Sequence, residues 1–411
     1  MSYSNPNCYP EFLNNKLKHF FFDKIKNEWG GQHIMRGKVT DQHSVELMSN
    51  DYLSIASNPD IIMAQKNALG ANENTLLMST VFLKKNSPQM IFEEKMARFL
   101  HADETVLCQS GYAANVGLIQ SMIGGTQTPI YVDQFAHMSL WDGAGMTQQK
   151  IIPFRHNSVA NLLTLIDQHG PGVVIVDSVY STNGSVCPLV ELVNEAFQLG
   201  CVLLVDESHS LGTHGPQGRG LVVEYGLQDK VMFRTASLAK AFASRAGVIA
   251  CPQYVADLFK MTSKPSIFSS SLLPHEIVGL DKTLDIIANA DIQRRRLKNN
   301  TDYLRQALDG LGYNVSTGEA QIIALESGSE YNTILLRDAL EKRGVFGSVF
   351  CAPATPKNRA IIRLSVSASL TKNQLDHVIL ECAEIVDELD VPHWRSSLRK
   401  RRPRSEHRQQ A

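Results

Sequence analysis

The sequence lacks several features that would each assign it to a class of protein. Its 411 residues contain seven cysteines and no CxxC pair, so we expect neither a dense disulfide framework nor a structural zinc site. No apolar run approaches the ~20 residues of a membrane-spanning helix, and the N-terminus lacks the basic and apolar regions of a secretory signal. We therefore expect a cytoplasmic protein with reduced, buried thiols, no metal site and no membrane span.

A net excess of charge is also missing from the chain taken as a whole, because the formal net charge is −1. Such a balance gives the protein no strong field that would attract nucleic acid or a membrane. The exception is the end of the chain, residues 395–411, where seven lysines and arginines face a single Glu406. Blocks of like charge repel and stay unfolded, so we expect a basic, disordered tail. The alternative is a tail that binds anionic lipid, nucleic acid or another protein.

Two short apolar runs predict the architecture of the protein. Val173 to Asp177 and Val202 to Asp206 each end in an aspartate, and continuous apolar strands of this length are typical of a sheet buried on both faces. The segment between them, Leu189 to Gly200, has the pattern of a crossover helix, which completes a βαβ unit. We predict an α/β fold with a mostly parallel sheet, whose ligands bind at the carboxyl ends of the strands.

The remaining pattern predicts the domain organisation. A long helix from Pro274 to Leu311 would lead out of the large domain, and alternating strands and helices over 313–390 indicate a smaller α+β domain. Shorter elements are expected as helices over 14–29 and 88–100, a strand within 45–53, and a strand, turn and helix over 105–115. The predicted units are an N-terminal helix and arm (1–50), a large domain (51–290), a small C-terminal domain (291–394) and the basic tail (395–411).

Lys240 is the residue from which most of the chemistry follows. A lone lysine is usually a solvated surface charge, but this one lies among Leu238, Ala239 and Ala241. An apolar setting lowers the pKa of an amine by desolvation. A lysine can form a Schiff base with pyridoxal phosphate (PLP), and an aspartate such as Asp206 can pair with its pyridinium nitrogen. The two residues together suggest a PLP site.

Further candidates surround this pair. His209, three residues after Asp206, can donate to the phenolic oxygen of the cofactor. The turn Ser110-Gly111-Tyr112 opens a predicted helix after a strand, and backbone N–H groups at such a helix terminus bind phosphate. Taken alone, each signal is weak. The pattern around His137, taken alone, favours a buried core histidine over a functional one.

Together these residues resemble the α-oxoamine synthases. Those are PLP enzymes of the aspartate-aminotransferase fold, fold type I, that condense an amino acid with an acyl-CoA. The resemblance runs from about Asn50 to Ala368. Four stretches carry it, and their combination is more specific than any single motif: residues 110–115 (SGYAAN), 205–212 (VDESHSLG), 237–240 (SLAK) and 268–274 (FSSSLLP).

The resemblance implies a role for each matching residue. Lys240 would hold PLP and remove the α-proton, Asp206 would pair with the ring nitrogen, and His137 would stack on the ring and donate to the thioester oxygen. Asn50 and Arg363 would hold the amino-acid carboxylate, since an arginine fork binds both oxygens. Ser270 would reach the phosphate bound in a partner subunit, which implies a homodimer. The implied cofactor-binding set is Ser110, Gly111, Tyr112, His137, Ser181, Asp206, His209, Ser237, Lys240 and Ser270.

Two departures from the family pattern indicate a changed substrate pocket. A glycine- and arginine-rich stretch is replaced by the bulkier Leu76 to Leu83, and the histidine expected after the strand of Arg363 is replaced by Ser369. The whole pattern is similar to the CqsA/LqsA-type autoinducer synthases. That resemblance implies condensation of 2-aminobutyrate or S-adenosylmethionine with a medium- or long-chain acyl-CoA, which gives an α-aminoketone precursor of a quorum-sensing signal.

Three alternatives stay open at this point. One is a 2-amino-3-ketobutyrate- or 8-amino-7-oxononanoate-type synthase, and another is an aminotransferase on the same scaffold, because one fold hosts many chemistries. The third is a catalytically silent, PLP-binding regulator that binds nucleic acid through its basic tail; the presence of Asp206, His209 and Lys240 argues against it.

Overall fold

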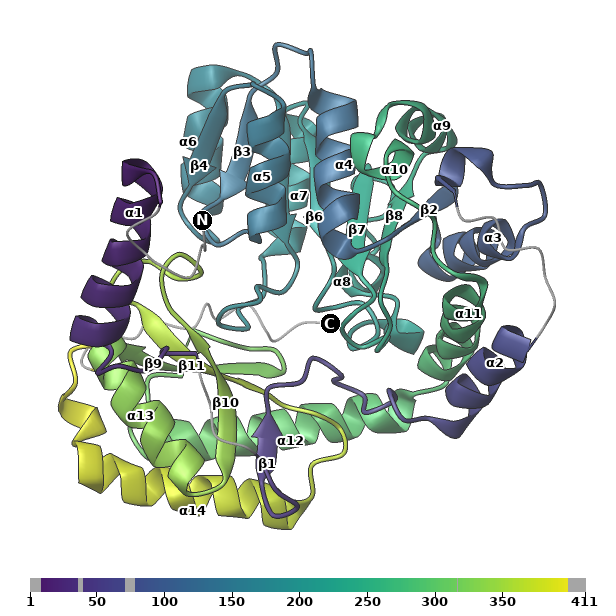
Figure 1. The fold of residues 1–411 in the computed structure, drawn as a ribbon. Coiled ribbons are helices and arrows are strands. Elements are labelled where there is room, and N and C mark those ends of the chain that lie inside the picture. Colours follow the sequence, from purple (N-terminus) through teal and green to yellow (C-terminus); the bar gives the residue numbers. More distant parts are fainter. Residues whose placement is uncertain (1–8, 36–39, 71–77, 316, 398–411) are drawn as a thin grey trace.

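A computed structural model describes residues 9–35, 40–70, 78–315 and 317–397. Figure 1 shows two sheets of different size, each with its own helices. Among these residues no helix combines the length and the apolar character that crossing a lipid bilayer requires. The six cysteines in the described ranges are buried and free. Residues 398–411 of the predicted basic tail lie outside the described residues.

The large sheet has seven strands and confirms the expected α/β fold. Only β8 runs antiparallel to its neighbours, and the other strand pairs are parallel. Asp177 and Asp206, which end β5 and β6, lie side by side in the register. Across the sheet the strands are β2 (Glu104–Cys108), β8 (Gly247–Cys251), β7 (Phe233–Ser237), β6 (Val202–Asp206), β5 (Val173–Asp177), β3 (Ile130–Asp133) and β4 (Ile151–Phe154).

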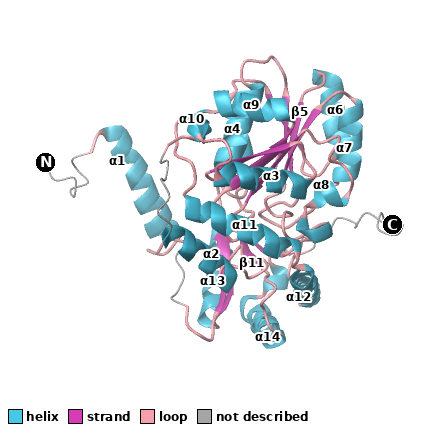
Figure 2. Cartoon of the chain, turned by 90° about the vertical axis from the view of Figure 1, so that its right-hand side faces the viewer, coloured by secondary structure: helices cyan, strands magenta, loops and turns pink. Residues whose placement is uncertain are grey.

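Alternating side chains of the strands divide the core into two layers. Ile175 and Leu204 pack on one face, against α4 (Gly111–Ile123), α5 (Met138–Met146) and α9 (Gln253–Thr262). Val174, Val176, Leu203 and Val205 pack on the other face, against α6 (Val159–His169) and α7 (Leu189–Gln198). Helix α7 is the predicted crossover. Figure 2 shows the strands between these two groups of helices, so both faces of the sheet are covered.

The prediction of a single long helix from Pro274 to Leu311 is wrong. The structure has two helices, α11 (Pro274–Ala288) and α12 (Asp291–Gly310), separated by Asn289 and Ala290. Arg294 of α12 folds back, and its Nη1 donates to the carbonyl oxygen of Ile287 at 2.8 Å. A cation on the last carbonyls of a helix stabilises its end, so Arg294 supports the break that the apolar pattern did not reveal.

The smaller sheet contains four strands in the order β1 (Val45–Leu47), β10 (Val345–Phe350), β11 (Ala360–Ser365) and β9 (Ile322–Gly328). Strand β1 pairs with β10 in parallel. Residues 45–47, which the sequence places in the N-terminal arm, therefore belong to the same sheet as residues 345–365. Helices α13 (Glu330–Lys342) and α14 (Lys372–Leu389) pack beside this sheet together with α12.

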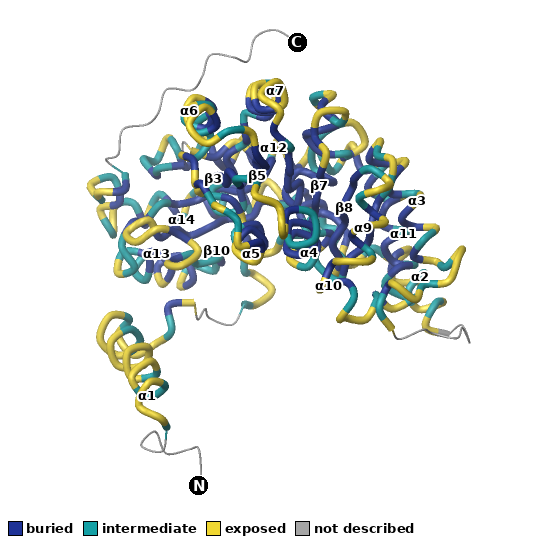
Figure 3. Tube along the Cα trace, turned by 90° about the horizontal axis from the view of Figure 1, so that it is seen from above, coloured by how far each residue is buried: buried dark blue, intermediate teal, exposed yellow. Residues whose placement is uncertain are grey.

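The first helix lies at the edge of the molecule. Helix α1 (Glu11–Lys18) continues as the π-type helix η2 (His19–Glu28), and no residue of either is buried. Figure 3 shows α1 as an exposed arm that projects away from the body of the molecule. The remaining elements are α2 (Pro59–Gly70), η3 (Thr80–Phe82), α3 (Pro88–Leu100), η4 (Pro216–Gly218), α8 (Leu221–Glu224), α10 (Lys264–Ile267) and η5 (Val391–His393).

Candidate active site

Lys240 lies just beyond the carboxyl end of β7, in a short loop that leads back to β8. The loop is closed by a hydrogen bond from the N–H of Leu238 to the carbonyl oxygen of Ala246, 2.9 Å long. Burial lowers the pKa of the Lys240 amine, and the nearby positive charge of Arg363 lowers it further, while Asp206 opposes the shift. A larger share of the amine is therefore neutral than for a surface lysine, and a neutral amine is the nucleophilic form.

Asp206 is held by two donors. Its Oδ2 accepts from Asn115 Nδ2 at 2.7 Å, and its Oδ1 accepts from the N–H of Ser208 at 2.8 Å. Only 3% of the residue is exposed, so its carboxylate is fixed in a dry environment. Sequence reasoning did not single out Asn115, although it lies one helical turn after Gly111 and therefore on the same face of α4.

His137 lies at the start of α5 and is joined to the end of β5. Its N–H donates to Asp177 Oδ2 at 2.9 Å, and its ring Nδ1 lies 2.7 Å from Ser139 Oγ. Burial lowers the pKa of the His137 ring. Burial, together with the neighbouring Asp206, raises the pKa of Asp177 well above its usual range. The two buried carboxyl groups at the strand ends therefore have different surroundings, and Asp177 supports the backbone of His137.

The turn from β2 to α4 leaves no room for a side chain. A Cβ on Gly111 would lie 2.6 Å from Ser237 Cβ and 2.8 Å from Ser237 Cα. Ser110 caps the helix, since its Oγ accepts from the N–H of Ala113 at 3.0 Å. The start of α4 and the end of β7 thus form a tight cradle of backbone and hydroxyl groups. Such a cradle next to a lysine and a buried aspartate fits PLP.

Three predicted cofactor residues lie at less enclosed positions. Half of Tyr112 is exposed, and its hydroxyl donates to Asp142 Oδ2 at 2.6 Å. Ser270 is also exposed, but its carbonyl oxygen accepts from Gln109 Nε2 at 2.8 Å, which ties its segment to the residue before Ser110. Ser181 contributes its carbonyl oxygen to Arg363. The roles of these three residues toward a cofactor stay predictions.

Arg363 joins three distant parts of the chain. Its Nη2 donates to Asn50 Oδ1 at 2.8 Å, and its Nη1 donates to the carbonyl oxygen of Ser181 at 2.9 Å. The guanidinium also lies over the ring of Phe350, 4.8 Å from its centroid. Its Nε is buried and has no partner among the described residues. The structure thus brings Asn50 and Arg363 together, as the shared role predicted for them requires.

His209 is held by Tyr52, a residue that sequence reasoning missed. The Tyr52 hydroxyl lies 2.7 Å from His209 Nδ1 and 3.2 Å from Asn50 Oδ1. The carbonyl oxygen of His209 accepts from Gln321 Nε2 at 2.8 Å. Burial, and the charges of Lys240 and Arg363, lower the pKa of His209 well below its usual range. This buried ring is therefore neutral and can donate a single hydrogen bond. Tyr52 follows Asn50 by two residues, which is the only sequence signal for it.

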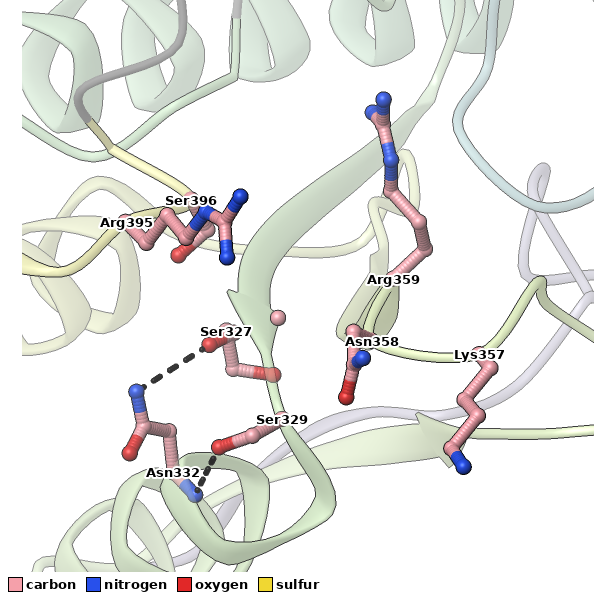
Figure 4. Close-up of a pocket in the computed structure, with 9 residues that line it drawn as sticks. Ser327, Ser329, Asn332, Lys357, Asn358, Arg359, Arg395 and Ser396 are labelled. Atoms are coloured by element: carbon pink, nitrogen blue, oxygen red, sulfur yellow. Dashed lines mark hydrogen bonds between the residues drawn. The ribbon is translucent and has the colours of Figure 1, made fainter.

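Two cavities lie outside this cluster. One of about 280 Å³ is lined by Thr80, Val81 and Leu83, from the segment that departs from the family pattern, together with residues including Met90, Val106 and Met261. Leu76 and Leu77 of that segment lie outside the described residues. The other, of about 580 Å³ (Figure 4), has polar and basic walls that include Ser329, Asn332 and Arg395. It contains none of the predicted site residues. Ser369, the second departure, accepts from Ser54 Oγ at 2.8 Å.

The fold and this cluster define the class of the protein as a PLP-dependent enzyme of fold type I. A family model described as aminotransferase class I and II matches residues 42–380. The chain belongs to that family and, within it, to the α-oxoamine synthases, as its relatives show.

The similar proteins are named as synthases and acyltransferases, and the match extends over nearly their full length. The chain is 44% identical over 375 residues to the CAI-1 autoinducer synthase of Vibrio campbellii. The match covers 91% of this chain and 95% of the relative. It is 29% identical to the 8-amino-7-oxononanoate synthase of Coprothermobacter proteolyticus, with 90% and 93% covered. It is 26% identical to the serine palmitoyltransferase of Sphingobacterium spiritivorum, with 93% and 95% covered.

Solved structures confirm the fold. The serine palmitoyltransferase of S. paucimobilis superposes with a TM-score of 0.82 at 23% identity, covering 93% of this chain and 98% of that one. The 8-amino-7-oxononanoate synthase of Francisella tularensis gives a TM-score of 0.75 at 23% identity, with 85% and 100% covered.

Proposed function

We propose that this chain is a PLP-dependent acyltransferase that condenses an amino acid with an acyl-CoA to make an α-aminoketone precursor of a quorum-sensing autoinducer. The observation that carries the proposal is Lys240, whose amine has a lowered pKa beside Asp206 and Arg363. The relative of 44% identity named as an autoinducer synthase supports this product class. The donor amino acid is, on the resemblance, 2-aminobutyrate or S-adenosylmethionine.

The bound cofactor supplies an electron sink for the α-carbon of the amino acid. Lys240 would hold the cofactor covalently, and its Nζ, when free, would take the proton from the α-carbon. Asp206 would keep the ring nitrogen protonated, and Asn115 and Ser208 hold its carboxylate in place for this. Ser110, Gly111 and Ser237 would bind the phosphate in the cradle.

Arg363 and Asn50 receive the amino-acid carboxylate. The two side chains already touch, and Arg363 has a buried Nε without a partner among the described residues. An incoming carboxylate can therefore form charge-assisted hydrogen bonds that the free protein lacks. This places the α-carbon next to Lys240, whose amine Arg363 influences electrostatically.

The α-carbon then forms a bond to the acyl carbonyl carbon, the C–S bond breaks, and coenzyme A leaves as its thiol. His137 donates a hydrogen bond to the thioester oxygen, on which negative charge develops. Loss of carbon dioxide from the resulting β-keto acid gives the aminoketone. The 280 Å³ cavity beside Val81 and Leu83 has mostly apolar walls, and we assign to it the end of the acyl chain.

We also propose that the protein works as a homodimer. Ser270 is exposed in the single chain, and on the resemblance it would reach the phosphate bound by a second copy. Large apolar side chains gather nearby on η3, α9 and α10, which contact one another. They include Phe82, Tyr254, Met261 and Phe268, which are 59%, 87%, 69% and 82% exposed. An apolar patch of this kind is typical of an interface.

The test combines product analysis with two lysine variants. PLP-loaded protein is incubated with a panel of acyl-CoAs and amino acids; free thiol is followed with a chromogenic reagent, and products are identified by mass spectrometry. We expect thiol release and an aminoketone with the wild type and with Lys298→Ala, an exposed lysine on α12. Turnover should fall by at least ~10³-fold in Lys240→Ala. Retained turnover in that variant would refute the assignment, and a 2-oxo acid formed without thiol would favour an aminotransferase.

A further inference from the structure

Among the residues that the structure describes, the hydrogen bonds to the ring of His137 fall on one nitrogen, Nδ1. Its Nδ1 lies 3.3 Å from the N–H of Ser139 and 2.7 Å from Ser139 Oγ. A backbone N–H can only donate, so Nδ1 is an acceptor and carries no proton in the neutral ring. The proton of neutral His137 is therefore on Nε2. The direction of the shorter bond follows, because the Ser139 hydroxyl must be the donor to Nδ1.

Ser139 is in turn oriented by Asn115. Asn115 Nδ2 lies 2.9 Å from Ser139 Oγ and 2.7 Å from Asp206 Oδ2. A carboxylate only accepts hydrogen bonds, so the NH₂ group of Asn115 must face Asp206, which settles the orientation of the amide. Its second hydrogen is then directed to Ser139 Oγ. One hydrogen of Asn115 therefore faces Asp206, while the donors from Asn115 to Ser139 and from Ser139 to His137 run in the opposite direction, away from Asp206.

Ser139, Asn115 and Asp206 are shielded from water, whereas His137 at the end of the series is exposed. Ser139 is 0%, Asn115 1% and Asp206 3% exposed. Water cannot replace a missing partner there, and an unpaired buried donor or acceptor is costly. The arrangement is therefore stiff, and it opposes a proton on Nδ1, which would face the N–H of Ser139.

We propose that Ser139 is a positioning residue that holds His137 as an Nε2–H donor, and that Asn115 couples this choice to the Asp206 carboxylate. The inference rests on the proposed function, in which His137 donates to the thioester oxygen. Asp206 and His137, which act on different parts of the reaction, are then oriented by one asparagine. A ring with its proton on Nδ1 presents a lone pair at Nε2 and cannot donate there.

A tautomer effect has a pH signature that a merely structural defect lacks. Ser139→Ala removes the hydroxyl that donates to Nδ1 at 2.7 Å and leaves only the longer 3.3 Å contact from the backbone N–H, so the neutral ring can populate the Nδ1–H form in part. We expect kcat to fall about tenfold, less than the full contribution of a general acid. At low pH the protonated ring carries both hydrogens, so the ratio of wild-type to variant kcat should narrow as the pH falls through the pKa of the ring. KM for the amino acid should change little, because Arg363 and Asn50 are untouched. Ser121→Ala makes the same exchange at a half-buried position on α4 and is the control.

A second readout does not depend on turnover. The ¹⁵N signals of histidine-labelled, PLP-loaded protein report which ring nitrogen carries the proton, and His137→Gln identifies the signal. We expect Nε2–H alone in the wild type, and a mixture of forms in Ser139→Ala and in Asn115→Ala, which keeps the serine but removes its donor. Unchanged signals in both variants, or an Nδ1–H ring in the wild type, would overturn the proposal. Loss of thiol release by the wild type would instead refute the proposed function and leave the tautomer result standing.

Discussion

Gly111 is a position where the candidate site tolerates little change. It is the first residue of α4, where alanine is otherwise preferred to glycine by about 1 kcal/mol. Here a Cβ would lie within 2.8 Å of the backbone of Ser237. Backbone cannot rotate away as a flexible side chain can, so the steric effect outweighs the helix preference and α4 must shift away from β7.

We therefore expect Gly111→Ala to weaken PLP binding at least tenfold, because the shift opens the phosphate cradle. Titration of cofactor-free protein with PLP, followed by absorbance, measures this. Gly145→Ala is the matched control: Gly145 is also helical, and its added Cβ would meet nothing within 4 Å. Equal PLP affinity of the two variants would contradict the cradle.

Asp177 gives a prediction for the pH dependence of stability. Burial raises its pKa in the folded protein, while the unfolded chain has the ordinary value near ~3.9. Between these two values the folded state binds more protons, so the free energy of unfolding falls as the pH rises through this window and stays lower above it. Asp177→Asn removes the titration but keeps an oxygen that accepts from the N–H of His137.

The variant should therefore be more stable than the wild type at about pH 8, by roughly 1 kcal/mol or more, with a difference that shrinks toward about pH 4. Urea unfolding at a series of pH values measures it. Asp167→Asn, at an exposed position on α6, should show no such pH-dependent difference. A constant difference between Asp177→Asn and the wild type at all pH values would refute the argument.

At this scale the sequence revealed the residues whose chemistry is unusual for their setting. Lys240 lies in an apolar run, and Asp206 ends an apolar strand, so each departs visibly from its surroundings. Asn115, Ser139 and Tyr52 do not, because polar residues near a turn are ordinary. Their importance comes from partners 157 residues apart for Tyr52 and His209 and 91 apart for Asn115 and Asp206. Only the folded chain shows such partners.

Among the elements, the sequence predicted those whose pattern is local. Strands β5 and β6 are continuous apolar runs and were expected with their bounds. Strand β7 was not, because it contains Arg234. That side chain is nevertheless 5% exposed, since its Nη1 donates to the carbonyl oxygen of Leu100 at 2.8 Å. The break between α11 and α12 was missed for a similar reason, because it depends on Arg294 reaching back to Ile287.

The η3 segment leads to a prediction about substrate choice. Leu83 lines the 280 Å³ cavity that we assign to the end of the acyl chain. A larger indole at this position would occupy part of that volume, so Leu83→Trp should shift the preferred acyl-CoA to a shorter chain. Each CH₂ group of the acyl chain that can no longer be buried costs ~0.8 kcal/mol of binding free energy. We therefore expect kcat/KM for the longest good substrate to fall about tenfold or more.

The measurement is kcat/KM over a series of acyl-CoAs of increasing length. Leu199→Trp makes the same exchange at an exposed position after α7 and should leave the profile unchanged. A uniform loss at every chain length in Leu83→Trp would place the acyl chain elsewhere, since only a blocked cavity discriminates by length.

At the scale of the whole molecule, the site is built where the two sheets meet. Lys240 and Asp206 come from the large sheet, while Arg363 comes from β11 of the small one. Asn50 follows β1, which the small sheet takes from the start of the chain. Asn50 and Arg363 lie 313 residues apart in the sequence. This explains why the sequence indicated the fold class more readily than the pairing of these two residues.

The proposed dimer can be tested through Phe268, which is 82% exposed two residues before Ser270. A lone exposed phenylalanine needs no explanation, but this one belongs to the apolar patch of η3, α9 and α10. A carboxylate placed in a closely packed apolar interface would be desolvated without a partner, which costs several kcal/mol. Phe268→Glu should therefore shift the protein from dimer to monomer at micromolar concentration, as light scattering during gel filtration measures.

The same variant separates the interface from the shared site. If Ser270 reaches the phosphate bound by a partner, the monomeric variant should bind PLP at least tenfold more weakly, although Phe268 is not itself one of the predicted site residues. Phe197→Glu, at a 48% exposed position on α7, makes the identical exchange on another surface and should stay dimeric and bind PLP normally. A Phe268→Glu protein that remains dimeric would show that this patch is not the interface. A monomer with full PLP affinity would show that each chain completes its own site, and Ser270 would lose its proposed role.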